Sequence, residues 1–320
     1  MYHVPMSEKK IIAVMGATGA QGGGVIRAIL EDPAGGFAAR AITRDVNSAK
    51  AKALRESGAE VVAADVDDPE SLRRAFEGAY GAFCVTFYWD HFSPEKELQQ
   101  AKNLAEAAKA AHLHHVVWST LEDTRRWVPL SDNRMPTLMG KYKVPHFDSK
   151  GEGNHFFTDA GVPTTMLLTA FYWDNFISFG SGPKKGPDGK LVFPMPMGDK
   201  KLPSIAAEDI GRCAYGILTD PGYIGKTVGI AGGHLTGAEM AAGMSKALGK
   251  EIPYYPVPFD VYRGLGFPGA EDLGNMFQFK HDFNEMYCAA RDLDFSRSLN
   301  PRLQTFEQWL GENAGKIAIG

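Results

Sequence analysis

Residues 11–22 read Ile-Ile-Ala-Val-Met-Gly-Ala-Thr-Gly-Ala-Gln-Gly and combine an apolar, β-branched run with three evenly spaced glycines. These glycines, Gly16, Gly19 and Gly22, are followed at residues 25–30 by apolar side chains at helical spacing. A strand, a glycine turn and a helix in this order let backbone N–H groups approach a pyrophosphate at the positive end of the helix dipole. A glycine pattern alone is weak evidence, but between a strand and a helix it predicts a nucleotide-binding turn.

Two charged residues follow the next two apolar runs. Arg44 ends the run 39–43, and an arginine at the end of the second strand accommodates the 2′-phosphate of NADP, where an acid would bind the ribose of NAD. Asp65 ends the run 61–64, where its carboxylate can accept a hydrogen bond from the adenine amine. A solvated loop charge at Arg44 and an ordinary turn aspartate at Asp65 are the alternatives. The pattern favours NADP(H) over NAD(H).

Strand and helix patterns alternate through the first half of the chain. The expected strands are residues 11–15, 39–43, 61–64, 82–86, 115–118 and 164–168. Their alternation with helices predicts an α/β protein with a Rossmann-type, doubly wound parallel sheet, which binds ligands at the carboxyl ends of its strands. Beyond Ala170 the alternation of strand and helix patterns ends. We therefore expect a NAD(P)-binding Rossmann domain over residues 1–170, to which later segments return, and a smaller C-terminal α/β lobe over residues 171–320 that shapes a pocket.

Composition limits the classes of partner. The 320 residues include 34 Lys and Arg against 38 Asp and Glu, so the chain is slightly acidic and lacks the basic surface that nucleic-acid binding needs. No apolar run is long enough to span a bilayer, and residues 1–10 lack the apolar core of a secretory signal. We expect no membrane contact and a cytoplasmic location, with the nucleus as an alternative.

The cysteines and histidines do not indicate a metal or disulfide framework. Cys84, Cys213 and Cys288 lie far apart without a C-x-x-C pair, which is typical of a reducing compartment. Cys84 and Cys213 are expected to be buried thiols. Three histidines fall within residues 112–115, but no cysteine or acidic ligand lies at zinc spacing from them. No metal site is predicted.

The residues around the fifth strand decide the chemistry. Short-chain dehydrogenases carry a serine after this strand and Tyr-x-x-x-Lys on the next helix, where the tyrosine protonates the substrate and the lysine holds the nicotinamide ribose. Ser119 and Lys150 occupy the serine and lysine positions, but His146 stands where the tyrosine should point. A histidine can donate a proton, although its ring is a poor replacement for a phenol. No catalytic residue is firm; the candidates are His146, Lys150 and Ser119, and a surface charge is the alternative for Lys150.

Several further motifs occur together along the chain. They are Gly-Ala-Thr-Gly-Ala-Gln-Gly at 16–22, Thr43-Arg44, Thr86-Phe87-Tyr88-Trp89, His146-Phe147-Asp148-Ser149-Lys150-Gly151, Tyr172-Trp173-Asp174-Asn175, Gly266-Phe267-Pro268-Gly269-Ala270, Asp272-Leu273 and Asn275-Met276-Phe277. With these motifs the chain resembles the NmrA-like family of atypical short-chain dehydrogenases over nearly its whole length, and within it the NADPH-sensing branch. The resemblance implies a Rossmann domain that binds NADP(H) without the dehydrogenase tyrosine. It also implies that the ratio of NADPH to NADP sets conformation, oligomeric state and partner binding.

The resemblance also assigns each motif a part of the cofactor. The pyrophosphate would lie in the turn of Gly16, Ala17, Thr18, Gly19, Ala20, Gln21 and Gly22. Arg44 would hold the 2′-phosphate, Asp65 would meet adenine, and Thr86, Phe87 and Tyr88 would follow the central stretch. Lys150 would hold the nicotinamide ribose, and Tyr172, Trp173, Asp174 and Asn175 would lie at the nicotinamide end. Two departures leave fewer cations near the phosphates and imply looser NADP selectivity: Val46-Asn47-Ser48 replaces basic residues, and Gln99 replaces a lysine.

Two functions remain open on the sequence. The favoured one is a redox sensor that binds NADP(H) and acts through a regulated protein partner, with a homodimer as one of its states. The alternative is an NADPH-dependent oxidoreductase of quinones or enone and carbonyl compounds, with His146 or water as the proton donor. Aromatic residues could line an apolar substrate pocket or, as we favour, pack between the lobes. They are Phe87, Tyr88, Trp89, Phe171, Tyr172, Trp173, Phe267 and Phe277.

Overall fold

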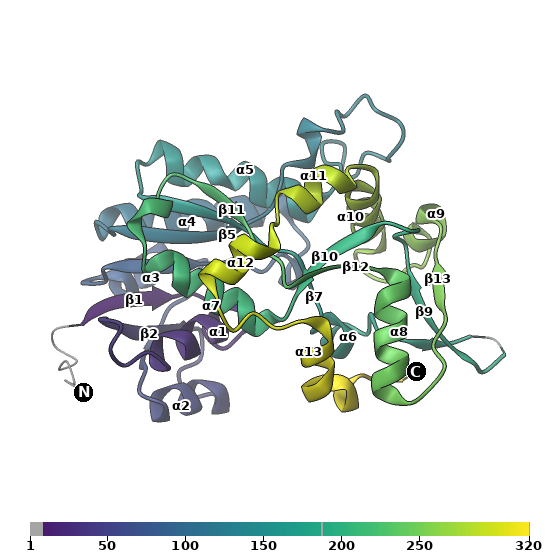
Figure 1. Cartoon of the computed structure of the whole chain (residues 1–320). Coiled ribbons are helices and arrows are strands. Elements are labelled where there is room, and N and C mark those ends of the chain that lie inside the picture. Colours follow the sequence, from purple (N-terminus) through teal and green to yellow (C-terminus); the bar gives the residue numbers. More distant parts are fainter. Residues whose placement is uncertain (1–8, 187, 320) are drawn as a thin grey trace. The chain divides into compact units, whose positions relative to one another are not determined.

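The computed structural model describes residues 9–186 and 188–319, which divide into two compact units (Figure 1). The first unit comprises the chain up to Asp123, Ser149–Leu168 and Glu208–Val228. The second comprises Thr124–Asp148, Thr169–Ala207 and the chain from Gly229 onwards. The sequence predicts no secretory signal in residues 1–10. Residues 1–8 of this segment lie outside the described residues.

The first unit is built on a seven-stranded sheet of order β11-β6-β5-β4-β1-β2-β3. The pairings from β3 across to β6 are all parallel, which confirms the predicted doubly wound sheet. The chain runs outward from β1 to β3 and then crosses to β4 on the other side of β1, so the topological switch point lies between β1 and β4. The strands are β1 (Lys10–Val14), β2 (Phe37–Thr43), β3 (Glu60–Ala63), β4 (Gly81–Cys84), β5 (His115–Thr120), β6 (Thr164–Leu168) and β11 (Thr227–Gly229).

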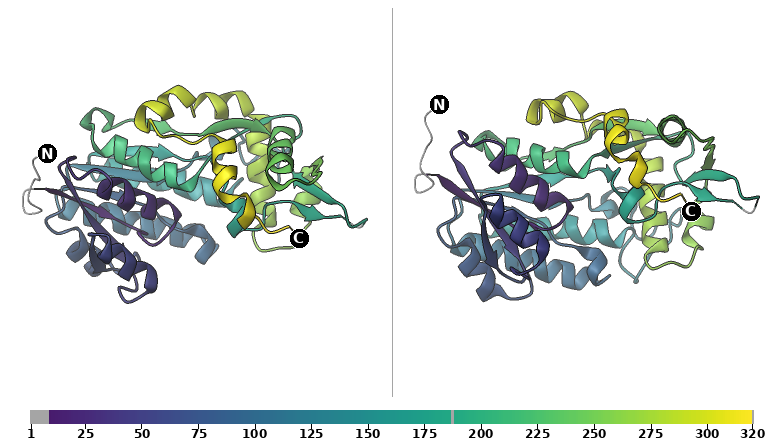
Figure 2. Two further views of the ribbon diagram at one scale, coloured as in Figure 1. Left: turned by 60° about the horizontal axis from the view of Figure 1, so that its bottom comes forward. Right: turned by 90° about the horizontal axis from the view of Figure 1, so that it is seen from below.

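Helices cover both faces of this sheet, as Figures 1 and 2 show. The continuous apolar runs of the central strands follow from this, because helices on both faces of a parallel sheet bury the side chains of both faces. On one face, Trp118 of β5 stacks on Phe157 within a core to which the helices that follow β3, β4 and β5 contribute. The helices are α1 (Ala20–Leu30), α2 (Ala49–Glu56), α3 (Pro69–Phe76), α4 (Pro94–Ala110), α5 (Pro145–Asp159) and α7 (Ala207–Leu218).

The second unit contains two three-stranded sheets, of orders β12-β10-β7 and β13-β9-β8, together with helices. The capping boxes of Thr236 with Glu239 and of Thr305 with Gln308 start α8 and α13. Its strands are β7 (Phe171–Tyr172), β8 (Lys184–Lys185), β9 (Leu191–Met195), β10 (Lys201–Ile205), β12 (Gly233–Thr236) and β13 (Tyr254–Pro256). Its helices are α6 (Asn175–Ser178), α8 (Gly237–Leu248), α9 (Phe259–Arg263), α10 (Ala270–Asp282), α11 (Asn284–Ala289), α12 (Leu293–Leu299) and α13 (Phe306–Asn313).

Cys84 and Cys213 are buried, as predicted, and burial raises the pKa of both thiols. Across the described residues, no helix has the length and apolar character needed to cross a bilayer. Over the same residues, no group of His, Cys, Asp and Glu side chains gathers in the way that a metal ion requires.

The buried imidazole of His115, on β5, makes stability depend on pH. Its Nε2 lies 2.9 Å from Oγ1 of Thr165, whose hydroxyl donates to the carbonyl of Tyr223, so Nε2 carries the proton. Nδ1 has no hydrogen-bond partner among the described residues. Burial lowers the pKa of His115 to about 4, against an opposing effect of Asp220. Between pH 6.5 and 4 the unfolded chain therefore binds a proton that the folded chain excludes, and stability falls as the pH falls.

We expect the His115 contribution to lower the free energy of unfolding by about 1 kcal/mol between pH 6.5 and 5.5. Urea unfolding at each pH measures it. The variant His115→Gln keeps an N–H for Thr165 but does not titrate in this range, so its stability should depend less on pH. Parallel pH profiles for the two proteins would contradict this account.

Candidate functional site

The glycine turn predicted at residues 16–22 connects β1 to α1. Gly16 has a φ of +63°, a left-handed conformation that residues with a Cβ rarely adopt. At Gly22 a Cβ would lie 2.5 Å from the carbonyl oxygen of Gly16 and 2.6 Å from that of Met15, so only glycine lets the helix start this close to the strand. Helix α1 begins after Gly19, and its first turn contains no acidic residue. The positive end of its dipole is therefore not offset by an acid of its own first turn, as an anion site requires.

Arg44 and Asp65 follow neighbouring parallel strands, β2 and β3, at their carboxyl ends. The Arg44 side chain is 73% exposed, and its guanidinium contacts the carboxylate of Asp90. The Asp65 carboxylate accepts a hydrogen bond from the N–H of Asp67 through Oδ1 at 2.9 Å. This bond supports the turn into α3, and the contact with adenine stays a prediction.

The residues that follow β4 and end β5 lie at the same edge of the sheet. Thr86 is buried, Tyr88 is buried and packs edge-on against Trp89, and Phe87 is half-exposed. Ser119 is buried in β5, and its hydroxyl donates to Oε1 of Gln21 at 2.8 Å. The candidate serine therefore contacts the glycine turn itself.

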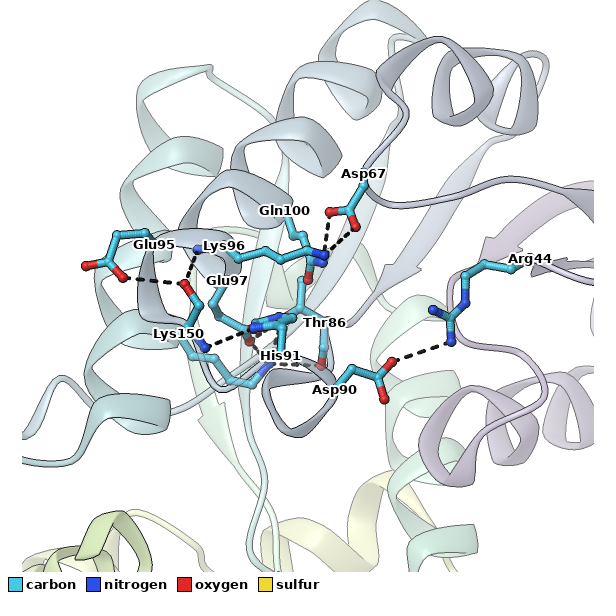
Figure 3. Close-up of polar contacts among 11 residues, drawn as sticks. Arg44, Asp67, Thr86, Asp90, His91, Glu95, Lys96, Glu97, Gln100 and Lys150 are labelled. Carbon is cyan, nitrogen blue, oxygen red and sulfur yellow. Dashed lines mark hydrogen bonds and ion pairs between the residues drawn. The ribbon is translucent and has the colours of Figure 1, made fainter. Parts of the chain in front are cut away.

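A buried carboxylate that the sequence analysis missed organises this edge. Glu97, on α4, is fully buried, and its Oε1 lies 2.6 Å from Nζ of Lys150 and 2.5 Å from Oγ1 of Thr86 (Figure 3). Its Oε2 lies 3.5 Å from Nε2 of His91. Burial by itself raises the pKa of Glu97, but the charge of Lys150, the nearby imidazole of His91 and the hydrogen bonds from Lys150 and Thr86 outweigh it and bring the pKa to about 2. Glu97 is therefore ionised at neutral pH.

Glu97 could have been recognised from the helical pattern. It shares a face of α4 with Ala101, Leu104 and Ala108, all of which are buried. A carboxylate on an apolar face must be paired, because an unpaired buried charge is costly. The sequence signal was therefore the position of a charge within the apolar stripe.

Lys150, on α5, is held by this carboxylate. Its ammonium group lies 2.6 Å from Glu97 and donates to both the hydroxyl and the carbonyl oxygen of Thr86, at 2.6 and 3.1 Å. An ammonium group has three protons, so each has an acceptor in this arrangement. The side chain is 12% exposed, which rules out a solvated surface charge as its description.

The second unit contains a histidine–carboxylate pair. Nδ1 of His146 lies 2.6 Å from Oδ1 of Asp272, and the backbone N–H of His146 donates to Oδ2 of the same carboxylate at 3.1 Å. Both side chains are buried. The pair joins two of the sequence motifs, 146–151 and 272–273, and fixes the orientation of the imidazole.

The segment 172–175, expected at the nicotinamide end, also belongs to the second unit. Trp173 is fully buried, packs against Phe306 and donates from Nε1 to Oγ of Ser204 at 2.8 Å. Asp174 accepts the N–H of Ala207 at 2.8 Å, at the start of α7. Tyr172 is half-buried. Trp173 therefore lies in the interior of its own unit, whereas Asp174 is partly buried and supports the start of α7.

The sequence was compared with known protein families and structures. The sequence profile of the NmrA-like family matches residues 8–310. The chain belongs to the NmrA-like family. Its sheet order and glycine turn are thus those of an NmrA-like protein, and the predicted family is confirmed.

Relatives of this NmrA-like protein carry names of two kinds. It is 32% identical to the NmrA-like family domain-containing oxidoreductase FrzB of Cladobotryum sp., covering 87% of this chain and 86% of FrzB. It is 29% identical to the NAD(P)H azoreductase of Xenophilus azovorans, covering 88% and 87%. The structure of NmrA, a negative transcriptional regulator, in complex with NADP has a TM-score of 0.76 at 24% identity, over 95% of both chains. The structure of NmrA in complex with NAD has a TM-score of 0.77. The likeness to NmrA shows the fold.

Proposed function

We propose that this NmrA-like protein binds NADP(H) and acts as a redox sensor, in which the oxidation state of the cofactor sets conformation and contact with a regulated protein partner. The observation that carries the proposal is the state of Lys150. A dehydrogenase lysine must offer its protons to the nicotinamide ribose and its charge to a tyrosine. Here Glu97 neutralises the charge, Glu97 and Thr86 accept the protons, and a histidine replaces the tyrosine. This arrangement favours binding over turnover.

The cofactor assignment rests on the first unit. The turn at 16–22 would hold the pyrophosphate, Arg44 the 2′-phosphate and Asp65 the adenine, with Thr86, Phe87 and Tyr88 along the centre. Arg44 at the end of β2 supports NADP(H) in preference to NAD(H). NmrA, which shares the fold and is a negative transcriptional regulator, has been crystallised with each cofactor.

A second candidate function is the reductase, and the His146–Asp272 pair favours it. A carboxylate that accepts from Nδ1 holds an imidazole in one orientation, as in sites where histidine transfers a proton. Relatives named as oxidoreductases and as an NAD(P)H azoreductase agree with such an activity. Its substrates would be quinones, enones, carbonyl or azo compounds.

One experiment separates the two functions. A sensor requires states that its ligands stabilise unequally, so saturating NADPH and NADP should give different hydrogen-exchange protection over residues 170–205 or different oligomer distributions. We also expect no substrate-dependent oxidation of NADPH against a panel of quinones, carbonyl and azo compounds. Identical exchange and size-exclusion profiles, together with turnover that His146→Ala abolishes, would instead establish the reductase.

A further inference from the structure

The partner of Arg44 lies on the opposite side of the switch point. Asp90 belongs to the 3-10 turn Tyr88–Asp90 that follows β4, whereas Arg44 follows β2, and these two strands flank β1 on opposite sides. Nη2 of Arg44 lies 3.4 Å from Oδ2 of Asp90 (Figure 3). Within residues 9–186 and 188–319, Asp90 is the only carboxylate in contact with this guanidinium. The pair therefore spans the edge at which a dinucleotide binds in this fold.

Lys96, at the start of α4, is also paired with an acid. Nζ of Lys96 lies 2.9 Å from Oδ2 of Asp67, and Gln100 donates to Oδ1 of the same carboxylate at 3.0 Å. Burial raises the pKa of Asp67, but hydrogen bonds from Lys96 and Gln100 and the charge of Lys96 outweigh it, so the pKa is lowered and the carboxylate stays charged. Lys96 is thus neutralised by Asp67.

The loop after Arg44 adds no further basic side chain until Lys50. Asp45 follows directly, and its carboxylate accepts the N–H of Asn47 at 2.8 Å. A phosphate that arrives at Arg44 therefore meets an exposed guanidinium that is already in contact with a carboxylate. A phosphate monoester is close to doubly charged at neutral pH, so Asp90 both competes with it for the guanidinium and repels it.

We infer that Asp90 is a specificity-determining residue, whose carboxylate competes with the 2′-phosphate of NADP(H) for Arg44 and so reduces the preference for NADP(H) over NAD(H). The inference rests on the proposed binding of a dinucleotide with its adenosine end at Arg44. NAD(H) has a hydroxyl in place of this phosphate, so its affinity is independent of the Arg44–Asp90 contact. Because both side chains are at least half exposed, Asp90 adjusts the preference without reversing it.

Calorimetric titration of the full chain with NADPH and with NADH tests this. Asp90→Asn removes the charge and keeps the shape of the side chain, and we expect it to tighten NADPH about two- to fivefold and leave NADH unchanged. The gain should shrink as the salt concentration rises, because the contact is exposed. In an Arg44→Ala background the same substitution should tighten NADPH less, because only the direct repulsion between Asp90 and the phosphate is then removed.

Glu106→Gln is the matched control. Glu106 is an exposed carboxylate on α4 that lies 3.7 Å from Lys102, so the substitution makes the same change in net charge away from Arg44. It should alter neither affinity. An unchanged ratio of NADPH to NADH affinity in Asp90→Asn, or an equal gain in Glu106→Gln, overturns the inference while dinucleotide binding stands. If the natural chain binds neither dinucleotide, the proposed function and the inference fall together.

Discussion

Lys150→Met is expected to lower the free energy of unfolding by about 3–5 kcal/mol, because it leaves the carboxylate of Glu97 buried without its cation. Glu97 is fully buried, and Lys150 is its nearest positive charge at 2.6 Å. Urea unfolding at pH 7 measures the loss. A loss below about 0.5 kcal/mol, as for a surface substitution, would contradict the pairing.

The double variant Glu97→Gln with Lys150→Met is the control for this experiment. It removes both charges and should recover much of the stability, since a neutral pair has no unpaired charge to bury. Acid gives a second readout. The lowered pKa of Glu97 contributes stability that is complete above its ordinary pKa of 4.5 and is lost as the pH falls towards 2. Lys150→Met should lack this acid-sensitive contribution.

Arg44→Ala is expected to weaken NADP(H) by about ten- to a hundredfold and leave NAD(H) nearly unchanged, because a hydrogen bond between charged groups contributes roughly 1.5–3 kcal/mol. The contact with Asp90 places the loss at the lower end of this range. Calorimetric titration measures both affinities. Arg55→Ala, which removes an exposed charge at the far end of α2, should change neither. Equal losses for both cofactors in Arg44→Ala would overturn the 2′-phosphate assignment.

Local patterns were sufficient to predict much of the first unit. The apolar residues of 94–110 recur at helical spacing and Ser93 precedes them as a cap, and this segment forms α4, Pro94–Ala110. The glycine turn could equally be predicted from the sequence, since the backbone conformation at Gly16 and the close contacts at Gly22 arise within the turn itself. Such features depend on residues close together in the sequence.

The pairings at the site could not be obtained in this way. Asp90 meets Arg44 across 46 positions, and Asp272 meets His146 across 126. Charge type alone does not select one partner among many acids. For Arg44 and Asp90 the choice is made by the strand ends that the sheet order places together, and for His146 and Asp272 by the contact of the first turn of α5 with α10. Lys150 was identified by its motif, but its carboxylate partner depends on how α4 and α5 pack against the sheet.

The route of the chain has a consequence for synthesis on the ribosome. The segment up to Asp123 supplies strands β1 to β5, but the outer edge of β5 stays bare until β6 is made, and β6 itself lacks its neighbour until residue 229. Unpaired edges of apolar parallel strands are prone to associate with other chains. A nascent chain of this protein must therefore protect β5 and then β6 while roughly the next hundred residues emerge, at about 5–20 residues per second. A fragment that ends near residue 170 would keep the edge of β6 unpaired permanently. We expect it to aggregate under conditions in which the full chain folds.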